Sequence, residues 1–102
     1  MLNLPKNIPE NIIEKINLLK EYLISIGCKK IILFGSLAEG NITLQSDIDI
    51  AVSGVEPGKY LKAVVVLPSL IKSKVDLINF EYISPEFRKI IERDGIKLYE
   101  KR

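Results

Sequence analysis

The sequence contains no histidine and a single cysteine, and each shortage excludes a class of site. Without histidine, the chain has no imidazole to act as a general base or to bind most transition metals. The lone Cys28 excludes an internal disulfide and cannot build a zinc site. Any bound metal must therefore be a hard cation that oxygen ligands hold.

Long apolar segments are also missing from the chain. No apolar run reaches the ~18 residues that a membrane-spanning helix needs. Residues 1–7 lack the charged-then-apolar order of a signal peptide. We therefore expect a cytoplasmic protein that does not enter a membrane.

Size and charge describe a small globular protein. The 102 residues, of which 47% are hydrophobic, predict one domain spanning residues 1–102 with one modest core. The net charge of +2 argues neither for nor against nucleic acid. No basic stripe interleaved with aromatic residues is present, so we expect no direct nucleic-acid partner.

The most informative pattern joins a turn to a pair of carboxylates. Ten residues separate Gly35-Ser36, which follows an apolar segment, from Asp47-Ile48-Asp49, which begins another. Residues i and i+2 of a strand share a face, so Asp47 and Asp49 should project to the same side. Two carboxylates ~6 Å apart repel by roughly 3 kcal/mol at an effective dielectric constant near 20. Folding does not need this arrangement, whereas binding of a divalent cation would explain it.

Apolar spacing and turn residues predict the helices and strands. We expect helices from Pro9-Glu10 to Gly27, over residues 59–72 and from the Ser84 cap to Ile91. Strands are expected at 30–34, 48–52 and 75–80, with an edge strand at 96–99. Residues 36–40 should form one helical turn, and a loop should follow at 41–46. Pro68 should kink or interrupt the helix at 59–72, and the three valines before it would also tolerate a strand.

These elements predict an α/β (α+β) fold with a small mixed sheet flanked by helices. A strand–helix–strand crossover should be right-handed and parallel, which places Asp49 beside Asp76 at the starts of the second and third strands. The first strand must run antiparallel to bring Gly35-Ser36 to the same edge. We therefore expect all three carboxylates and the Gly-Ser turn to converge on one rim of the sheet.

The combined pattern resembles the DNA polymerase β-like nucleotidyltransferase superfamily. It consists of Gly35-Ser36, ten residues, Asp47-x-Asp49 and a third acid, Asp76, on a later strand. Within the superfamily, the chain is similar to minimal nucleotidyltransferase (MNT) domains, and the segment 91–100 is similar to their usual end. The resemblance implies the polymerase β-like fold and Mg²⁺-dependent nucleotidyl transfer, with Mn²⁺ as a substitute.

The resemblance also implies a role for each residue of the pattern. Asp47 and Asp49 would hold two Mg²⁺ ions and the nucleotide, and Asp76 would hold the catalytic ion and could accept a proton. Gly35 would let the backbone approach the triphosphate, and Ser36 would bind its oxygens. Lys74 shares a face with Asp76, where it would touch phosphate or relieve the repulsion between carboxylates.

Many relatives carry arginine where this chain has Glu39, and an inward-pointing acid there would weaken nucleotide binding. The resemblance implies an antitoxin that transfers AMP from ATP to a hydroxyl side chain of a HEPN-type toxin, in a hetero-oligomer with that partner. Two alternatives stay open. One is a non-catalytic antitoxin that neutralises its partner by binding, and the other is a nucleotidyltransferase that acts on a small molecule.

Overall fold

A computed structural model describes residues 4–41 and 47–102. The elements within these ranges are α1 (Glu10–Ser25), β1 (Lys30–Phe34), α2 (Gly35–Ala38), β2 (Ile48–Ser53), α3 (Pro57–Ile71), β3 (Val75–Asn79), the 3₁₀ turn η1 (Phe80–Tyr82), α4 (Pro85–Asp94) and β4 (Ile96–Glu100). The predicted loop at 41–46 lies outside the described residues except for Asn41. No helix in the described ranges is both long and apolar enough to cross a membrane.

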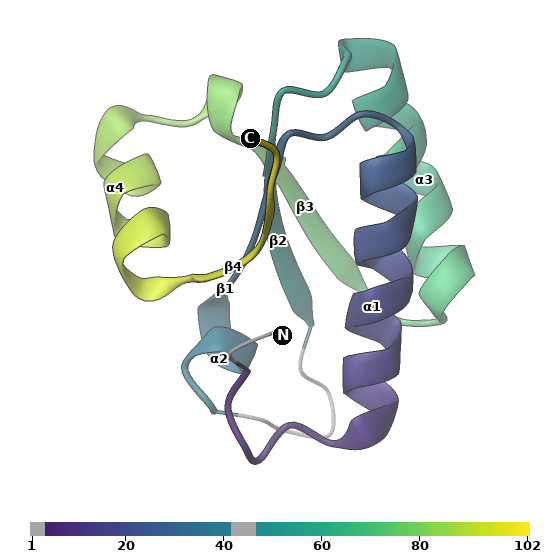
Figure 1. Ribbon diagram of the computed structural model, residues 1–102, viewed down its shortest axis with the longest axis vertical. Helices are drawn as coiled ribbons and strands as arrows, with labels where there is room; N and C mark the ends of the chain where they lie inside the picture. Colours follow the sequence, from purple (N-terminus) through teal and green to yellow (C-terminus); the bar gives the residue numbers. More distant parts are fainter. Residues whose placement is uncertain (1–3, 42–46) are drawn as a thin grey trace.

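The strands form one mixed sheet in the order β3-β2-β1-β4. β1 is antiparallel to both β2 and β4, while β2 and β3 are parallel and joined through α3. Figure 1 shows α1 and α3 side by side on one face of the sheet and α4 on the other. The predicted mixed sheet, its antiparallel first strand and its parallel crossover are therefore confirmed.

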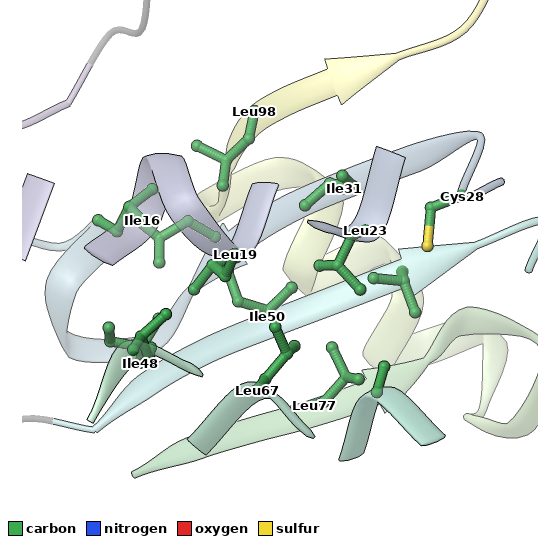
Figure 2. Close-up of a cluster of buried hydrophobic side chains, with 14 of the residues drawn as sticks. Ile16, Leu19, Leu23, Cys28, Ile31, Ile48, Ile50, Leu67, Leu77 and Leu98 are labelled. Carbon is green, nitrogen blue, oxygen red and sulfur yellow. The ribbon is translucent and has the colours of Figure 1, made fainter. Parts of the chain in front are cut away.

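The main core lies between the sheet and the α1–α3 layer. Every second residue of β2 faces this layer, because side chains alternate along a strand. Figure 2 shows apolar side chains from α1, α3 and the strands meeting there. These include Ile16, Leu19 and Leu23 of α1, Leu67 of α3, and Ile31, Ile48, Ile50 and Leu77 of the sheet. Complete burial of one such side chain contributes about 1.5–3 kcal/mol, so this face dominates stability.

A smaller core lies on the opposite face, beneath α4. Its buried members are Ile32, Ala51, Phe80 and Ile91. Ile32 of β1 pairs with Ala51 of β2, which in turn pairs with Ile78 of β3. This row of apolar side chains marks where α4 covers the sheet, and the next row toward the start of β2 forms the candidate site.

Helix α3 corrects one prediction made from the sequence. The helix begins two residues earlier than expected, at Pro57, and the predicted interruption at Pro68 is wrong because α3 runs on to Ile71. Pro68 lies in the last turn, where the single missing N–H leaves only the carbonyl of Val64 without its helical donor. Val64 is exposed, so water can solvate that carbonyl. The helix ends where Lys72 adopts left-handed backbone angles.

Helix α4 begins as its sequence predicts. The Ser84 hydroxyl accepts a hydrogen bond from the Phe87 N–H at 3.1 Å, and Pro85 occupies the first helical position. The helix continues beyond Ile91 to Asp94, and Gly95 then leads into β4. β4 pairs with β1, which confirms the predicted edge strand and ties α4 to the sheet.

Gly95 provides a test of how tightly α4 packs against β1. A Cβ atom there would lie 2.5 Å from the Ile91 carbonyl oxygen and 2.6 Å from Ile32 Cγ2. We expect Gly95→Ala to lower the free energy of unfolding by about 1–3 kcal/mol, because backbone must shift. Gly58→Ala is the matched control, since nothing lies within 4 Å of its Cβ position. Urea unfolding of both variants measures the difference, and equal midpoints would contradict the packing argument.

Candidate active site

One row of side chains crosses the sheet directly below the smaller core. Phe34 of β1 pairs with Asp49 of β2, and Asp49 pairs with Asp76 of β3. Paired residues on neighbouring strands share a face, with Cα atoms about 5 Å apart. The row therefore places an aromatic ring and two carboxylates in order across three strands. The predicted proximity of Asp49 and Asp76 is confirmed by this register.

Gly35 lies against the carboxylate of Asp49. It begins α2 with φ +74°, a conformation that side chains other than glycine rarely adopt. A Cβ at this position would collide with Asp49 Oδ2 and lie 3.0 Å from Asp49 Cγ. Glycine is therefore required here for two independent reasons, the backbone conformation and the closeness of the carboxylate.

The turn after Gly35 is one helical turn, as the sequence predicts. Leu37 is fully buried and anchors α2, while the backbone N–H of Asn41 donates to the Ser36 carbonyl at 2.9 Å. The Asn7 side chain donates to the Gly40 carbonyl at 2.8 Å, which ties the turn to the segment before α1. Glu39 is exposed at the end of α2, where solvent screens its charge.

Asp47 lies two residues before Asp49 and is half-buried. Its Oδ2 lies 3.7 Å from Lys74 Nζ, and 81% of the Lys74 side chain is exposed. An ion pair this open contributes little to stability. It supports the reading of Lys74 as a residue that relieves repulsion between the carboxylates.

Electrostatic crowding is greatest at Asp49. Burial raises the pKa of its carboxyl above the ordinary value, and the negative charges of Asp76 and Asp47 raise this pKa further. The three acids therefore lie close enough to interact. However, the described ranges contain no group of three acidic, cysteine or histidine side chains gathered tightly enough to hold a metal ion. The backbone therefore brings the three acids to one edge of the sheet, as predicted. Their three side chains do not gather into one cluster, because like charges repel and Asp47 pairs with Lys74.

The donor set nevertheless suits a hard cation. All the candidate ligands are carboxylate oxygens, which Mg²⁺ and Mn²⁺ prefer. Asp49 and Asp76 would hold such an ion between them. Asp47 would become a third ligand once its carboxylate separates from Lys74.

Tyr60 and Phe34 belong to the site, although the sequence patterns do not identify them. The Tyr60 hydroxyl of α3 donates to the Leu77 carbonyl at 2.8 Å, next to Asp76 on β3. Burial is the main reason why the pKa of the Tyr60 hydroxyl is raised, and the negative charge of Asp76 raises this pKa further. This bond fixes the start of α3 to β3 and so steadies the strand that carries Asp76. Only the strand register, which pairs Phe34 with Asp49, could have indicated a place for Phe34.

The geometry agrees with a match to a family of known proteins. Residues 10–102 match the family model described as Polymerase beta, Nucleotidyltransferase. The chain belongs to this family. A Methanocaldococcus jannaschii protein named "Putative protein adenylyltransferase MJ1379" is 42% identical to this nucleotidyltransferase over 74 residues, which cover 67% of the chain and 74% of that protein.

Solved structures give the same fold for this nucleotidyltransferase. A crystal structure of a toxin–antitoxin with AMP-PNP matches with a TM-score of 0.73 and 26% identity, over 84% of this chain and 73% of that one. A structure of tri-AMPylated Shewanella oneidensis HEPN toxin in complex with MNT antitoxin matches with a TM-score of 0.61 and 25% identity, over 90% of this chain and 71% of that one. The polymerase β-like fold and the relation to minimal nucleotidyltransferases, inferred from sequence resemblance, are confirmed.

The raised pKa of Asp49 predicts how stability of the nucleotidyltransferase depends on pH. An acid whose pKa is raised by folding destabilises the fold when it is ionised, and the fold regains stability as pH falls through the folded pKa toward the ordinary value of 3.8. We expect Asp49→Asn, measured by urea unfolding without divalent cations, to be at least as stable as the parent at pH 7. Its advantage should shrink toward pH 4. A clearly less stable variant at pH 7 would refute the repulsion argument.

A substitution at Gly35 tests whether the contact with Asp49, and not backbone strain alone, is needed for metal binding. Gly35→Ala should displace the Asp49 carboxylate and lower the affinity for Mn²⁺ by about tenfold or more, because metal ligands need accurate placement. Gly27→Ala is the matched control, since Gly27 has φ +98° but nothing within 4 Å of its Cβ position. Manganese titration followed by electron paramagnetic resonance measures both. Equal losses in the two variants would show that strain alone, and not the contact with Asp49, causes the effect.

Proposed function

We propose that this nucleotidyltransferase transfers AMP from ATP to a hydroxyl side chain of a HEPN-type toxin and thereby acts as its antitoxin. The observation that carries the proposal is the placement of Asp49 beside Asp76, with Gly35 against the first carboxylate. The name of the M. jannaschii relative and the AMPylated toxin bound to an MNT antitoxin support the choice of donor and acceptor.

We propose a role for each residue of the site that is consistent with its position. Asp47, Asp49 and Asp76 would hold two Mg²⁺ ions, which would stabilise charge as the acceptor hydroxyl bonds to the α-phosphorus of ATP and pyrophosphate leaves. Asp76 would also accept the proton of the acceptor hydroxyl, since it lies at the outer side of the carboxylate row. Gly35 leaves room for the triphosphate to approach the backbone, and Ser36 would donate a hydrogen bond to a phosphate oxygen.

The open side of the row favours a macromolecular acceptor. In the sheet formed by the described residues β3 is an outermost strand, and Asp76 on it is exposed. A side chain on the surface of a folded protein can reach this position without entering a deep pocket. This access supports a protein acceptor over a small molecule, which usually needs walls to hold it.

Labelling of the partner tests the proposal. A HEPN-type toxin, sought as a small helical protein encoded by the neighbouring gene, is incubated with the nucleotidyltransferase, ATP and Mg²⁺, and mass spectrometry of the toxin should show a gain of one or more AMP units. Asp47→Ala, Asp49→Ala and Asp76→Ala should each reduce labelling at least about a hundredfold, because each removes a proposed metal ligand. Ser36→Ala should reduce it only about two- to tenfold, since one of several hydrogen bonds is lost.

Asp94→Ala is the matched control for these variants, because Asp94 is exposed at the end of α4 and pairs with its neighbour Arg93. It should label the partner as the parent does. The binding-only alternative predicts a different result, in which the triple aspartate variant neutralises the toxin fully and AMP is never found. That result would require the catalytic proposal to be abandoned.

A further inference from the structure

We propose that Phe87 of α4, supported by Phe34, forms a stacking platform for the nucleobase of the donor nucleotide. The inference rests on the proposed function, since it takes a nucleoside triphosphate as the ligand of the carboxylate row. It adds what the row itself cannot provide, which is a surface for the base.

The two rings form one unit beside the carboxylates. Phe34 and Phe87 pack edge to face, with centroids 6.2 Å apart and planes at 90°. Phe34 is the member of the row next to Asp49, and it shares the face of the sheet on which Asp49 lies. Phe87 therefore lies at the border where the cover provided by α4 ends and the acidic row begins.

Phe87 is held in place before any ligand arrives. Its backbone N–H donates to the Ser84 hydroxyl at the start of α4, and its ring packs edge to face with Phe34. Arg88 and Ile91, one and four residues after Phe87, anchor α4, because Arg88 donates to the Phe80 carbonyl at 2.6 Å and Ile91 is buried. A ring on such a rigid support loses little entropy when a base stacks on it.

The exposure of Phe87 distinguishes it from a core residue. Phe87 is 40% exposed, whereas Ile91, one turn later on the same helix, is 1% exposed. The smaller core closes around Phe80 and Ile91. An edge-to-face pair covers at most one face of either ring, so Phe34 leaves at least one face of the Phe87 ring for another partner, and an aromatic face is the surface on which a base stacks.

The row and the aromatic pair place a site for phosphate beside a site for a base. Neighbouring strands lie about 4.8 Å apart, which is the distance between the backbones of Phe34 and Asp49, and the centre of the Phe87 ring lies 6.2 Å from the centre of the Phe34 ring. In the proposed arrangement the α-phosphate is at the carboxylates, the base is over the Phe87 ring and the ribose lies between them.

A stacking platform has a definite consequence for base preference. Every base has a π-face, so stacking supplies affinity without reading the hydrogen-bonding edge. We therefore infer that Phe87 contributes equally to the binding of ATP and GTP. Any preference between these nucleotides must then come from other residues.

The test compares nucleotides with a ligand that has no base. Calorimetric titration with Mg²⁺ present gives the affinity of the parent and of Phe87→Ala for ATP, GTP and tripolyphosphate. We expect Phe87→Ala to weaken ATP and GTP by about tenfold each, while tripolyphosphate binding stays unchanged. Phe87→Trp should bind both nucleotides at least as tightly as the parent. Ile90→Ala is the matched control, because Ile90 is 47% exposed on α4 but has no aromatic face.

Each alternative result has a clear meaning. Equal weakening of ATP and tripolyphosphate would overturn the platform and assign Phe87 a structural role, and Phe87→Leu, which keeps apolar bulk, replaces Phe87→Ala if the latter unfolds. An unchanged ATP affinity together with weaker toxin binding would assign Phe87 to a protein interface. If the parent binds ATP no more tightly than tripolyphosphate, the stacking platform is overturned while the proposed AMP transfer is not. If ATP binding depends on Phe87 but AMP transfer never occurs, the proposed function fails and the platform stands.

Discussion

The parallel pairing of β2 with β3 is the contact on which the site depends. It places Asp49 directly beside Asp76, although two ionised carboxylates at that spacing repel by roughly 3 kcal/mol. The opposite face of the same strands more than offsets this cost. Ile48, Ile50 and Leu77 are buried there against α1 and α3, and each contributes about 1.5–3 kcal/mol. A slip of the register by one residue would send these apolar side chains to the wrong face, so the core and the acidic row are fixed together.

One face of the sheet holds the main core, and the other face carries the candidate site. The face beneath α1 and α3 is covered along its length, whereas α4 covers only part of the other face (Figure 1). The polar row lies where this cover ends, so its carboxylates meet solvent while Gly35 and Phe34 support them from β1 and α2. Partial burial raises the pKa of Asp49 without removing it from reach of a cation.

Much of this arrangement follows from local patterns in the sequence. Alternating apolar residues around Asp49 and the Ser84-Pro85 cap predict β2 and the start of α4, and handedness of the crossover predicts that Asp76 lies beside Asp49. The rest depends on contacts distant in sequence. Pro68 does not interrupt α3, because it lies in the last turn beside an exposed carbonyl. Lys74 pairs with Asp47, and Phe87 meets Phe34 only because β4 draws α4 onto β1. The spacing of apolar residues along the chain contains no information about contacts between residues that are distant in sequence.

The outer position of β3 also has a consequence for dynamics. Edge strands exchange amide hydrogens through local opening, which needs less free energy than unfolding of the central strands. Among the strands within residues 4–41 and 47–102, β3 has a neighbour on one side only, and the Tyr60 hydroxyl donates a hydrogen bond to its backbone at Leu77. Asp76 is therefore on an edge strand, while its companion Asp49 is on a central one. The lifetime of the assembled row is then set by how long β3 stays docked, and any ligand that bridges Asp49 and Asp76 also holds the edge of the sheet closed.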